Sequence, residues 1–303
     1  MQKIQVLMST YNGEKYVSEQ IESILSQTGV KTAILVRDDD SKDKTLKILE
    51  EYRKKGSLEY YAGANIGYIR SFMDLLFAAP DAEYYAFSDQ DDVWCPTKLL
   101  RATTLLSENN YDKPACYFSN LKVVDADLKY KGIKDFKGMK LTLGSILVRQ
   151  RAAGCTIVFN KELAEVIRNK DFENADIKIG HDNWIFLVCL CIGGRIIYDK
   201  KSLILFRRHN STITGIGGGL KKRITNEIKI FGENRNVKQR TAELLLEKYR
   251  GLSIPSHIKL LEAIVHYRDS FADTICLLFN KELRCGIKIV DLMIKMAILF
   301  RRF

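Results

Sequence analysis

The sequence predicts an α/β fold, with a mostly parallel sheet flanked by helices and an α-helical C-terminal region after it. Over residues 4–87, strand-like apolar runs alternate with runs whose apolar residues recur at helical spacing. Such alternation is typical of βαβ units and a parallel sheet. Polar and acidic segments directly follow the expected strands, where ligands of parallel sheets bind. After Pro96 the alternation ends, and the last part of the chain shows only helix-spaced patterns.

The first expected element is a buried strand at residues 4–8, followed by a polar turn at residues 9–13. Residues 14–27 are expected to form a helix, because Val17, Ile21 and Ile24 recur at helical spacing. The same reasoning gives the remaining elements of the alternating part in order. Further strands are expected at residues 32–36, 58–62 and 84–87, and further helices at residues 43–55 and 68–79.

The second half of the chain is less regular. A basic loop at residues 129–151 is expected to cover the site, and residues 182–191 to form a helix. Three consecutive glycines at residues 217–219 are the strongest break in the pattern and predict a hinge. We therefore expect two domains, residues 1–218 and residues 219–303. Strands are expected in the first at residues 115–124, 155–159, 196–198 and 202–206.

The most informative segment is SDQDDVW at residues 88–94, which places three carboxylates within four residues after an apolar strand. Like charges at the end of a buried strand raise the pKa of one another. A divalent cation removes that cost, and Mg²⁺ or Mn²⁺ prefers hard oxygen ligands together with substrate phosphates. The segment therefore predicts a metal site, and a solvated acidic turn is the alternative.

Composition and charge limit the class of protein. The chain has 303 residues, of which 46% are hydrophobic and 28% charged, as in an ordinary folded soluble protein. Of the net charge of +11, residues 219–303 carry +8, with 17 Lys and Arg against 9 Asp and Glu. Seven cysteines without a C-x-x-C pair favour a reduced, cytosolic compartment. No signal peptide is evident, and the longest charge-free apolar stretch, residues 183–194, is too short to span a bilayer.

Several common nucleotide-binding motifs are missing from the sequence. It contains neither G-x-G-x-x-G after the first strand nor G-x-x-x-x-G-K-[ST], and no G-x-S-x-G surrounds Ser9. What remains is a nucleotide-diphosphate pocket that uses a metal in place of a glycine-rich phosphate loop. A nucleotidyltransferase would carry a glycine- and lysine-rich loop after the first strand, whereas residues 9–15 contain one glycine.

Residues 1 to about 215 resemble a family 2 glycosyltransferase with the GT-A fold, which has a Rossmann-like nucleotide-binding sheet. STYNGEKYVSEQIESILSQT resembles the opening strand and helix of that family, RDDDSKDKT its DDGSTDGT segment, NIG its NxG turn and SDQDDVW its D-x-D segment. Within the family, SDQDDVW, GHDNW and RRHNSTITG are most similar to bacterial rhamnosyltransferases of cell-wall polysaccharides. The resemblance implies metal-dependent, inverting transfer of L-rhamnose from dTDP-L-rhamnose, or of a hexose from a UDP-sugar.

The resemblance assigns roles on the donor side by position. Thr10 and Tyr11 line the base pocket, and Asp39 accepts the base N3–H, which either uracil or thymine supplies. Asp91 binds the metal, Mn²⁺ or Mg²⁺, and Asp89 is its partner near ribose and metal. Four neighbouring expectations complete this side: Asp38 supports the turn, Asp40 replaces the usual glycine and leaves the loop conformation open, Asp92 caps the next helix, and Trp94 packs under the loop or lines the acceptor site.

The resemblance also implies a catalytic base and groups near the diphosphate. Asp182 in GHDNW is the expected base, which takes the proton of the acceptor hydroxyl, and the alternative is that it caps a helix. His181 either contacts the acceptor or is structural, and Trp184 is a candidate on the acceptor side. Arg207 and His209 are expected to meet the diphosphate, with a solvated basic turn as the alternative.

The sequence of the C-terminal region is compatible with two kinds of partner. Residues 284–303 form a basic amphipathic pattern that ends in FRRF. It fits either an anionic membrane surface or packing on its own core or at a dimer interface. A lipid-linked glycan acceptor at the cytoplasmic face of the membrane would account for the first. The rival readings are a non-catalytic sugar-nucleotide-binding or membrane-scaffold protein, and nucleic-acid binding, which lacks any recognised module.

Overall fold

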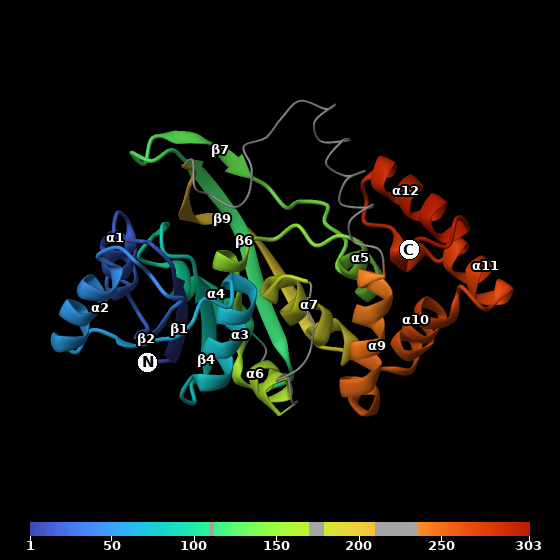
Figure 1. The fold of residues 1–303 in the computed structure, drawn as a ribbon, viewed down its shortest axis with the longest axis horizontal. Coiled ribbons are helices and arrows are strands. Elements are labelled where there is room, and N and C mark those ends of the chain that lie inside the picture. The colour runs from blue at the N-terminus through green and yellow to red at the C-terminus, as the bar shows by residue number, and fades with distance from the viewer. Residues whose placement is uncertain (109–111, 170–178, 210–235) are drawn as a thin grey trace. The chain divides into compact units, whose positions relative to one another are not determined.

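The structure is a computed structural model that describes residues 1–108, 112–169, 179–209 and 236–303 (Figure 1). The chain divides into two compact units, each considered by itself. Unit 1 comprises Met1–Lys137, Ala152–Lys170 and Arg195–Asn210, and unit 2 comprises Gly138–Arg151, Asp171–Gly194 and Ser211–Phe303. The domain boundary expected at residue 218 and the hinge expected at residues 217–219 lie outside the described residues.

Four parallel strands form the first half of the sheet in unit 1. Central β1 (Lys3–Thr10) pairs in register with β2 and β4, so that Val6 lies beside Ile34 and Ala86. The pattern of alternating strands and helices at residues 4–87 is therefore confirmed. The other elements of this half are β2 (Lys31–Asp38), β3 (Glu59–Ala62), β4 (Tyr84–Ser88), α1 (Val17–Leu25), α2 (Thr45–Lys54) and α3 (Tyr68–Ala78).

Helices bury both faces of this sheet. On one face, Ile4, Val6 and Met8 of β1 belong to a core cluster that also includes apolar side chains of α1, α2 and α4 (Lys98–Ser107). On the other face, the ring of Phe87 lies 5.3 Å from that of Phe72 on α3. Because both faces are buried, successive side chains of β1 from Ile4 to Met8 are all buried, and four of these five are apolar, with Gln5 as the exception.

The second half of the sheet mixes parallel and antiparallel strands. The strand order is β3-β2-β1-β4-β8-β6-β9-β5, with β7 paired to β6 outside this path. β6 and β9 are parallel, whereas β8 is antiparallel to both β4 and β6. The expected fold class, a mostly parallel sheet flanked by helices, is confirmed. The elements are β5 (Val93–Trp94), β6 (Ala115–Val124), β7 (Tyr130–Lys134), β8 (Val158–Asn160), β9 (Arg195–Arg207) and α6 (Lys161–Arg168).

The structure corrects two expectations that concern strand β9 and the basic loop. The strands expected at residues 196–198 and 202–206 are one strand, because an irregularity in the β6–β9 register accommodates the charged residues between them. The loop expected at residues 129–151 contains β7, which forms a hairpin with β6. The same loop contains α5 (Leu143–Val148), whose start is fixed by a capping box between Thr142 and Ser145.

Two shorter corrections concern residues close to the acidic segment. The strand expected at residues 155–159 begins only at Val158, because Gly154–Thr156 form a 3₁₀ turn. Asp92 was expected to cap the next helix, but α4 begins at Lys98 with Thr97 at the cap position. Asp92 instead precedes β5 and is fully buried.

Unit 2 contains helices and no strand among its described residues. In its core the ring of Trp184 on α7 (His181–Cys191) lies 6.1 Å from that of Tyr249 on α9. α9 packs against α10, α10 against α11, and α11 against α12. The helical region expected at the C-terminal end is thus confirmed for the described residues. Its elements are α9 (Val237–Tyr249), α10 (Pro255–His266), α11 (Phe271–Phe279) and α12 (Lys288–Leu299).

Candidate active site

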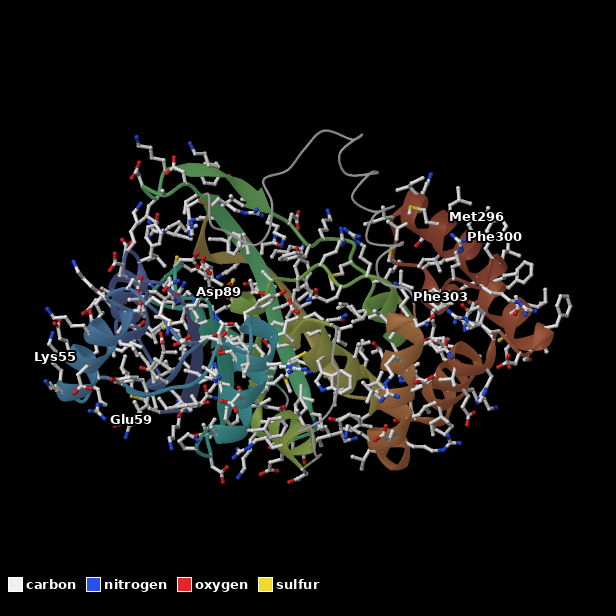
Figure 2. The ribbon with its side chains drawn as sticks, viewed as in Figure 1. Lys55, Glu59, Asp89, Met296, Phe300 and Phe303 are labelled. Carbon is white, nitrogen blue, oxygen red and sulfur yellow. The ribbon has the colours of Figure 1, made fainter. Side chains whose placement is uncertain are left out.

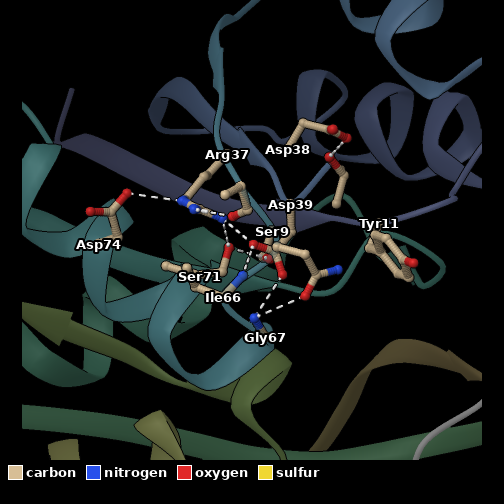
Figure 3. A network of polar contacts seen from close by, with 12 residues as sticks. Ser9, Tyr11, Arg37, Asp38, Asp39, Ile66, Gly67, Ser71 and Asp74 are labelled. Atoms are coloured by element: carbon tan, nitrogen blue, oxygen red, sulfur yellow. Dashed lines mark hydrogen bonds and ion pairs between the residues drawn. The ribbon is translucent and has the colours of Figure 1, made fainter. Parts of the chain in front are cut away.

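Asp39 stands at the centre of a polar network that joins the end of β2 to the turn before α3 (Figure 3). Its carboxylate accepts hydrogen bonds from the backbone N–H groups of Ile66 and Gly67, both at 2.9 Å, and forms an ion pair with the Arg37 guanidinium. Arg37 also donates through Nε to Asp74 Oδ2 at 2.9 Å. The network therefore fixes the turn at residues 65–67 relative to β2.

Asp38 and Asp40 have different functions in the loop that follows β2. Asp38 accepts from the Thr10 hydroxyl at 2.8 Å, the Ser41 backbone N–H at 2.8 Å and the Ser41 hydroxyl at 2.6 Å. It thus supports the turn, as expected. Asp40 has φ 71, the left-handed conformation that glycine would adopt freely. The loop therefore keeps the backbone of the glycine that the family pattern has there, and Asp is among the side chains that tolerate it.

Tyr11 is the exposed aromatic side chain of the first turn, with 48% of its surface accessible, whereas Thr10 is fully buried. The side-chain amide of Gln90 holds the backbone of Tyr11 from both sides: Tyr11 N–H donates to Gln90 Oε1, and Gln90 Nε2 donates to Tyr11 carbonyl oxygen, each at 2.9 Å. A Cβ at Gly13 would lie 2.2 Å from Gln90 Oε1, so any side chain there would displace the Gln90 amide. The acidic segment and the first turn are therefore directly joined.

The acidic segment follows β4 and contains one fully buried carboxylate, that of Asp92. Its Oδ1 accepts from the backbone N–H of Arg207 at 3.1 Å. Burial first, and then the charges of Asp89 and Asp91, raise the pKa of Asp92 well above its ordinary value. Burial also raises the pKa of the Cys155 thiol. The effect of like-charge repulsion on pKa, which was inferred from the sequence, is thus seen at Asp92.

Arg207 and His209 hold Asp91 from the far end of β9. Arg207 is buried, and it donates to the carbonyl oxygens of Asp91 at 2.8 Å and Ala126 at 2.5 Å and pairs with Glu19. His209 Nε2 lies 2.7 Å from Asp91 Oδ2. The ring of Tyr16 contacts both groups, with centroid distances of 4.5 Å to the guanidinium and 4.9 Å to the imidazole. Three segments far apart in sequence therefore converge on Asp91.

The residues that could hold a divalent cation are the carboxylates of this segment. Ligand atoms of Asp89, Asp92 and Cys155 lie within 4.8 Å of one another. Two carboxylates suit Mg²⁺ or Mn²⁺, whereas a thiol of raised pKa is protonated and is a poor ligand for a hard ion. Asp91 retains an accessible carboxylate, with 18% of its side chain exposed, next to the imidazole of His209. The structure thus brings Asp89 together with Asp92 and Cys155, whereas the carboxylate of Asp91, the metal ligand expected from the sequence, faces His209.

Asp182, His181 and Trp184 lie in α7 of unit 2 and are described by their own surroundings. α7 begins at His181, with Gly180 at the cap position and Asp182 in the first turn, so Asp182 is not itself the cap residue. Asp182 Oδ1 accepts from the backbone N–H of Asn183 at 2.8 Å, and a Cβ at Gly180 would lie 2.3 Å from that oxygen. Burial lowers the pKa of His181 to about 3, so its imidazole is neutral at physiological pH.

Several site residues were not found from the sequence. Gln90, Tyr16 and Glu19 carry no pattern that separates them from surface residues of a turn or of the first turn of a helix. Lys98 gives even less signal: it is fully buried, with Nζ 3.4 Å from the centroid of the Trp94 ring. Trp94 itself is 2% exposed, which agrees with packing beneath the loop. The only signal in the sequence for the contact between Trp94 and Lys98 is that Trp94 lies four residues before Lys98.

A parallel sheet with carboxylates at its carboxyl edge, and without a glycine-rich phosphate loop, is the arrangement of glycosyltransferases that use nucleotide sugars. Residues 5–165 match the family model described as Glycosyl transferase family 2, and the chain belongs to that family. The resemblance stated from the sequence is thus confirmed. The protein is a glycosyltransferase, and catalytically inactive readings of the chain are set aside.

Two relatives carry names that state the donor sugar. The dTDP-rhamnosyl transferase RfbG of Shigella flexneri is 31% identical over 221 residues, which are 69% of this chain and 73% of the relative. The UDP-Glc:alpha-D-GlcNAc-diphosphoundecaprenol beta-1,3-glucosyltransferase WfgD of Escherichia coli is 34% identical over 111 residues, which are 35% of this chain and 42% of the relative. The first match covers a larger share of this chain than the second.

Solved structures share the GT-A fold. The structure of residues 1–349 of TarS of Staphylococcus aureus in complex with UDP-GlcNAc gives a TM-score of 0.63 at 19% identity and covers 99% of this chain and 87% of that chain. The complex of the same protein with UDP gives 0.59 at 21% identity, with 92% and 76% covered. Within the described residues, the helices are all too short or too polar to traverse a bilayer.

Proposed function

We propose that the protein catalyses inverting, metal-dependent transfer of L-rhamnose from dTDP-L-rhamnose to a growing, lipid-linked cell-surface polysaccharide. One observation carries the proposal: the partly exposed carboxylate of Asp91 lies at the carboxyl end of β4, 2.7 Å from His209 and next to buried Arg207. A metal ligand beside a guanidinium suits a leaving group of concentrated negative charge, such as a nucleoside diphosphate.

The donor base is proposed to lie between Tyr11 and Asp39. The exposed ring of Tyr11 offers a face on which a pyrimidine can stack. The Asp39 carboxylate already accepts from two backbone N–H groups and from the Arg37 guanidinium, and a carboxylate has about four acceptor positions in all. One acceptor position is therefore available for a base N3–H, beside Thr10 at the end of β1. This contact does not separate thymine from uracil.

The choice of rhamnose over a UDP-hexose rests on the relatives. RfbG, a dTDP-rhamnosyl transferase by name, is matched over 69% of this chain. WfgD, whose name gives UDP-Glc as donor, is matched over 35%. The broader match favours dTDP-L-rhamnose, and a UDP-hexose is the second candidate. WfgD also supports a lipid-linked acceptor, because its name specifies a sugar on diphosphoundecaprenol.

The metal is proposed to be Mn²⁺ or Mg²⁺, held by Asp91 and Asp89. A divalent cation, when bound, supplies positive charge that offsets the negative charge developing on the departing diphosphate. Arg207 fixes the loop that presents Asp91, through its bonds to the carbonyl oxygens of Asp91 and Ala126. The Arg207 guanidinium also adds positive charge close to this loop.

Asp182 is proposed to be the catalytic base. It takes the proton of the acceptor hydroxyl as the acceptor oxygen bonds to the anomeric carbon, while the bond from that carbon to the diphosphate oxygen breaks on the opposite face. Gly180 leaves the space that the Asp182 carboxylate occupies. Neutral His181 and the aromatic side chains Trp94 and Trp184 are the proposed acceptor-side residues, the two tryptophans acting through packing because both are buried.

The place of action is proposed to be the cytoplasmic face of the plasma membrane, where a peripheral protein would meet a lipid-linked glycan. Nucleotide sugars are polar and charged, so donor and lipid-linked acceptor meet only at the membrane surface. The excess positive charge of the C-terminal region, +8 over residues 219–303, suits the anionic lipid of such a face. A dimer interface is the alternative use of that region.

A donor panel tests the proposal directly. Binding of dTDP-L-rhamnose, UDP-glucose and UDP-GlcNAc to the full chain would be measured with Mn²⁺, with Mg²⁺ and with excess chelator. Saturable, metal-dependent binding of dTDP-L-rhamnose alone supports the assignment. Equal or tighter binding of a UDP-sugar would assign that sugar as the donor instead. Full binding in excess chelator would refute the proposed metal dependence.

Two substitutions separate the roles of metal ligand and base. Asp91→Asn should abolish both transfer and metal-dependent donor binding, whereas the exposed Asp127→Asn in the same unit should leave both unchanged. Asp182→Asn should retain donor binding but lose transfer by about 10²–10⁴-fold. Asp273→Asn is its control, since Asp273 also lies in the first turn of a helix. Loss of donor binding in Asp182→Asn would assign it a structural role instead.

A further inference from the structure

Two neighbouring helices at the C-terminal end of the chain expose an unusual amount of apolar surface. Phe271 and Phe279 of α11 are 79% and 75% exposed, and Phe300 directly after α12 is 66% exposed. Ordinary surface helices direct such side chains inward. The exposed set, called the apolar face below, consists of Phe271, Ile275, Phe279, Ile289, Leu292, Met296, Leu299 and Phe300.

The residues of the apolar face follow helical geometry in α11. Phe271, Ile275 and Phe279 are spaced four residues apart, so each lies about 40° around the helix from the last. Ala272 and Cys276 fall on the same side and are also exposed. Leu277, on the opposite side, is buried. One side of α11 therefore packs inside unit 2, and the other presents an uninterrupted apolar strip.

α12 repeats this arrangement. Ile289, Leu292, Met296, Leu299 and Phe300 span an arc of about 100° at 3.6 residues per turn. Val290, Ile294 and Ile298 lie on the other side and are buried, so packing fixes which side of α12 is exposed. Met296 and Phe300 lie next to each other on this helix in Figure 2. Because α11 packs against α12, the two strips belong to one two-helix element.

Positive charge accompanies the apolar face. Lys281, Arg284, Lys288, Arg301 and Arg302 are all exposed, and they lie between the two helices in sequence or at the ends of α12. No acidic side chain of residues 271–303, all of which the structure describes, is in the exposed class. Asp291, for example, is partly buried and accepts from the Cys285 backbone N–H at 2.8 Å. The accessible charge of this element is therefore uniformly positive.

We propose that the apolar face of α11 and α12 docks on an anionic lipid surface, with both helices lying in the plane of the interface. Exposed phenylalanines beside lysine and arginine are the composition of interfacial helices. α12 has 12 residues and is about 18 Å long, well short of the roughly 30 Å hydrocarbon core. The element therefore lies on the membrane and does not cross it.

Charge distinguishes lipid from a second copy of the chain as the occupant. In a two-fold dimer the same patch meets itself, so the exposed lysines and arginines of one copy would face those of the other. Anionic headgroups instead complement these side chains while the acyl region receives the phenylalanines. The sequence pattern had indicated residues 284–303 alone, whereas the structure adds α11 and two of the three exposed phenylalanines. The inference depends on neither the donor nor the metal.

Vesicle binding by the full chain tests the inference. Protein would be sedimented with vesicles of phosphatidylglycerol and phosphatidylcholine, and with phosphatidylcholine alone. We expect binding to the anionic vesicles that weakens as salt is raised. The double variant Phe271→Ser/Phe279→Ser should bind on the order of 10²-fold more weakly, since each substitution removes a large apolar group that lipid would bury on binding. Leu252→Ser, at a residue of unit 2 that is 51% exposed and outside the apolar face, is the control and should bind as wild type.

A fluorescence reporter shows whether the face enters lipid. In Phe300→Trp the new indole should shift its emission to the blue on anionic vesicles and be quenched by brominated acyl chains. The native Trp94 and Trp184 are 2% and 0% exposed, so their signal should not change. Absence of quenching together with unchanged sedimentation of the serine variant would overturn the proposal. Concentration-dependent dimerisation that the serine variant abolishes, without vesicle binding, would assign the face to a second copy instead. Donor binding is measured in parallel and should be unaffected in every variant.

Discussion

Replacing Asp39 by asparagine should test the polar network that fixes the donor side of the site. The substitution keeps the shape of the side chain but removes its charge and turns one acceptor into a donor. Asp39 Oδ1 faces the Ile66 N–H and the Arg37 guanidinium, and Oδ2 faces the Gly67 N–H. In either orientation of the new amide, its NH₂ group faces at least one N–H donor.

The size of the effect follows from burial. An unsatisfied buried N–H costs about 1–3 kcal/mol, and removing one partner of a buried ion pair costs about 3–5 kcal/mol. Arg37 is 5% exposed but retains Asp74 at 2.9 Å and the Ala64 carbonyl oxygen at 3.0 Å. We therefore expect Asp39→Asn to lower the free energy of unfolding by about 3 kcal/mol, the lower end of the ion-pair range.

Asp74→Asn is the matched control, because it makes the same atomic change on the same arginine. The Asp74 side chain is 48% exposed, so solvent screens its pairing and the expected loss is about 1 kcal/mol or less. The double variant Arg37→Met/Asp39→Asn removes the buried charge together with its partner, and should recover a large part of the loss.

Urea unfolding at pH 7, followed by circular dichroism, measures the wild type, these three variants and the single variant Arg37→Met. A loss in Asp39→Asn no larger than that in Asp74→Asn would refute the reasoning. So would a double variant whose loss equals the sum of the losses of Arg37→Met and Asp39→Asn, because the two side chains would then not interact in the folded protein.

Three further substitutions have defined outcomes. Folding lowers the pKa of Lys98 from 10.5 to about 7 by burial, so the unfolded chain binds the extra proton between those pH values and stability rises with pH across them. Lys98→Met should therefore raise the free energy of unfolding most at pH 7 and below, by up to about 5 kcal/mol at 1.36 kcal/mol per pKa unit. It should also remove the increase of stability between pH 7 and pH 10. Equal gains in urea unfolding at pH 7 and pH 10 would contradict this. Asp40→Gly should change stability by less than about 1 kcal/mol, since glycine adopts φ 71 freely, whereas Asp40→Val should lower it by about 1–3 kcal/mol; thermal unfolding of the pair checks the order. Gly13→Ala should displace Gln90 and break its two bonds to Tyr11, raising the KM for donor severalfold while costing about 1 kcal/mol of stability; an unchanged KM would show that these bonds do not order the donor loop.

Local patterns predicted most of the fold. Residues 4–87 alternate between strand and helix because each βαβ unit buries its strand on both faces, and that requirement leaves a strong periodic signal. The errors arose where tertiary structure overrode the pattern. Three charged residues in the middle of β9, Asp199, Lys200 and Lys201, looked like a break between strands, but the sheet continues past them because the β6–β9 register shifts there.

The candidate site was predictable where one segment carries its own chemistry, as SDQDDVW does. It was not predictable where the partner lies far along the chain. Nothing in the sequence places Tyr16 under both Arg207 and His209, or Lys98 over the Trp94 ring. Arg207 was expected to face the diphosphate, and the structure shows its guanidinium largely engaged with backbone carbonyl oxygens. Such contacts depend on how strands return to one edge of the sheet, which residue periodicity does not record.

The paired bonds between Gln90 and Tyr11 have a thermodynamic consequence. The side-chain amide of Gln90 donates to and accepts from the backbone of Tyr11, as one residue does to its partner in a β-sheet. The loop carrying Asp91 and the turn carrying Tyr11 therefore shift together. If one loop orders with the base and the other with the metal, each ligand should increase the affinity for the other by the same factor. A nucleoside without phosphates, which touches no metal, should then still tighten Mn²⁺ binding, and Gln90→Leu should uncouple the two.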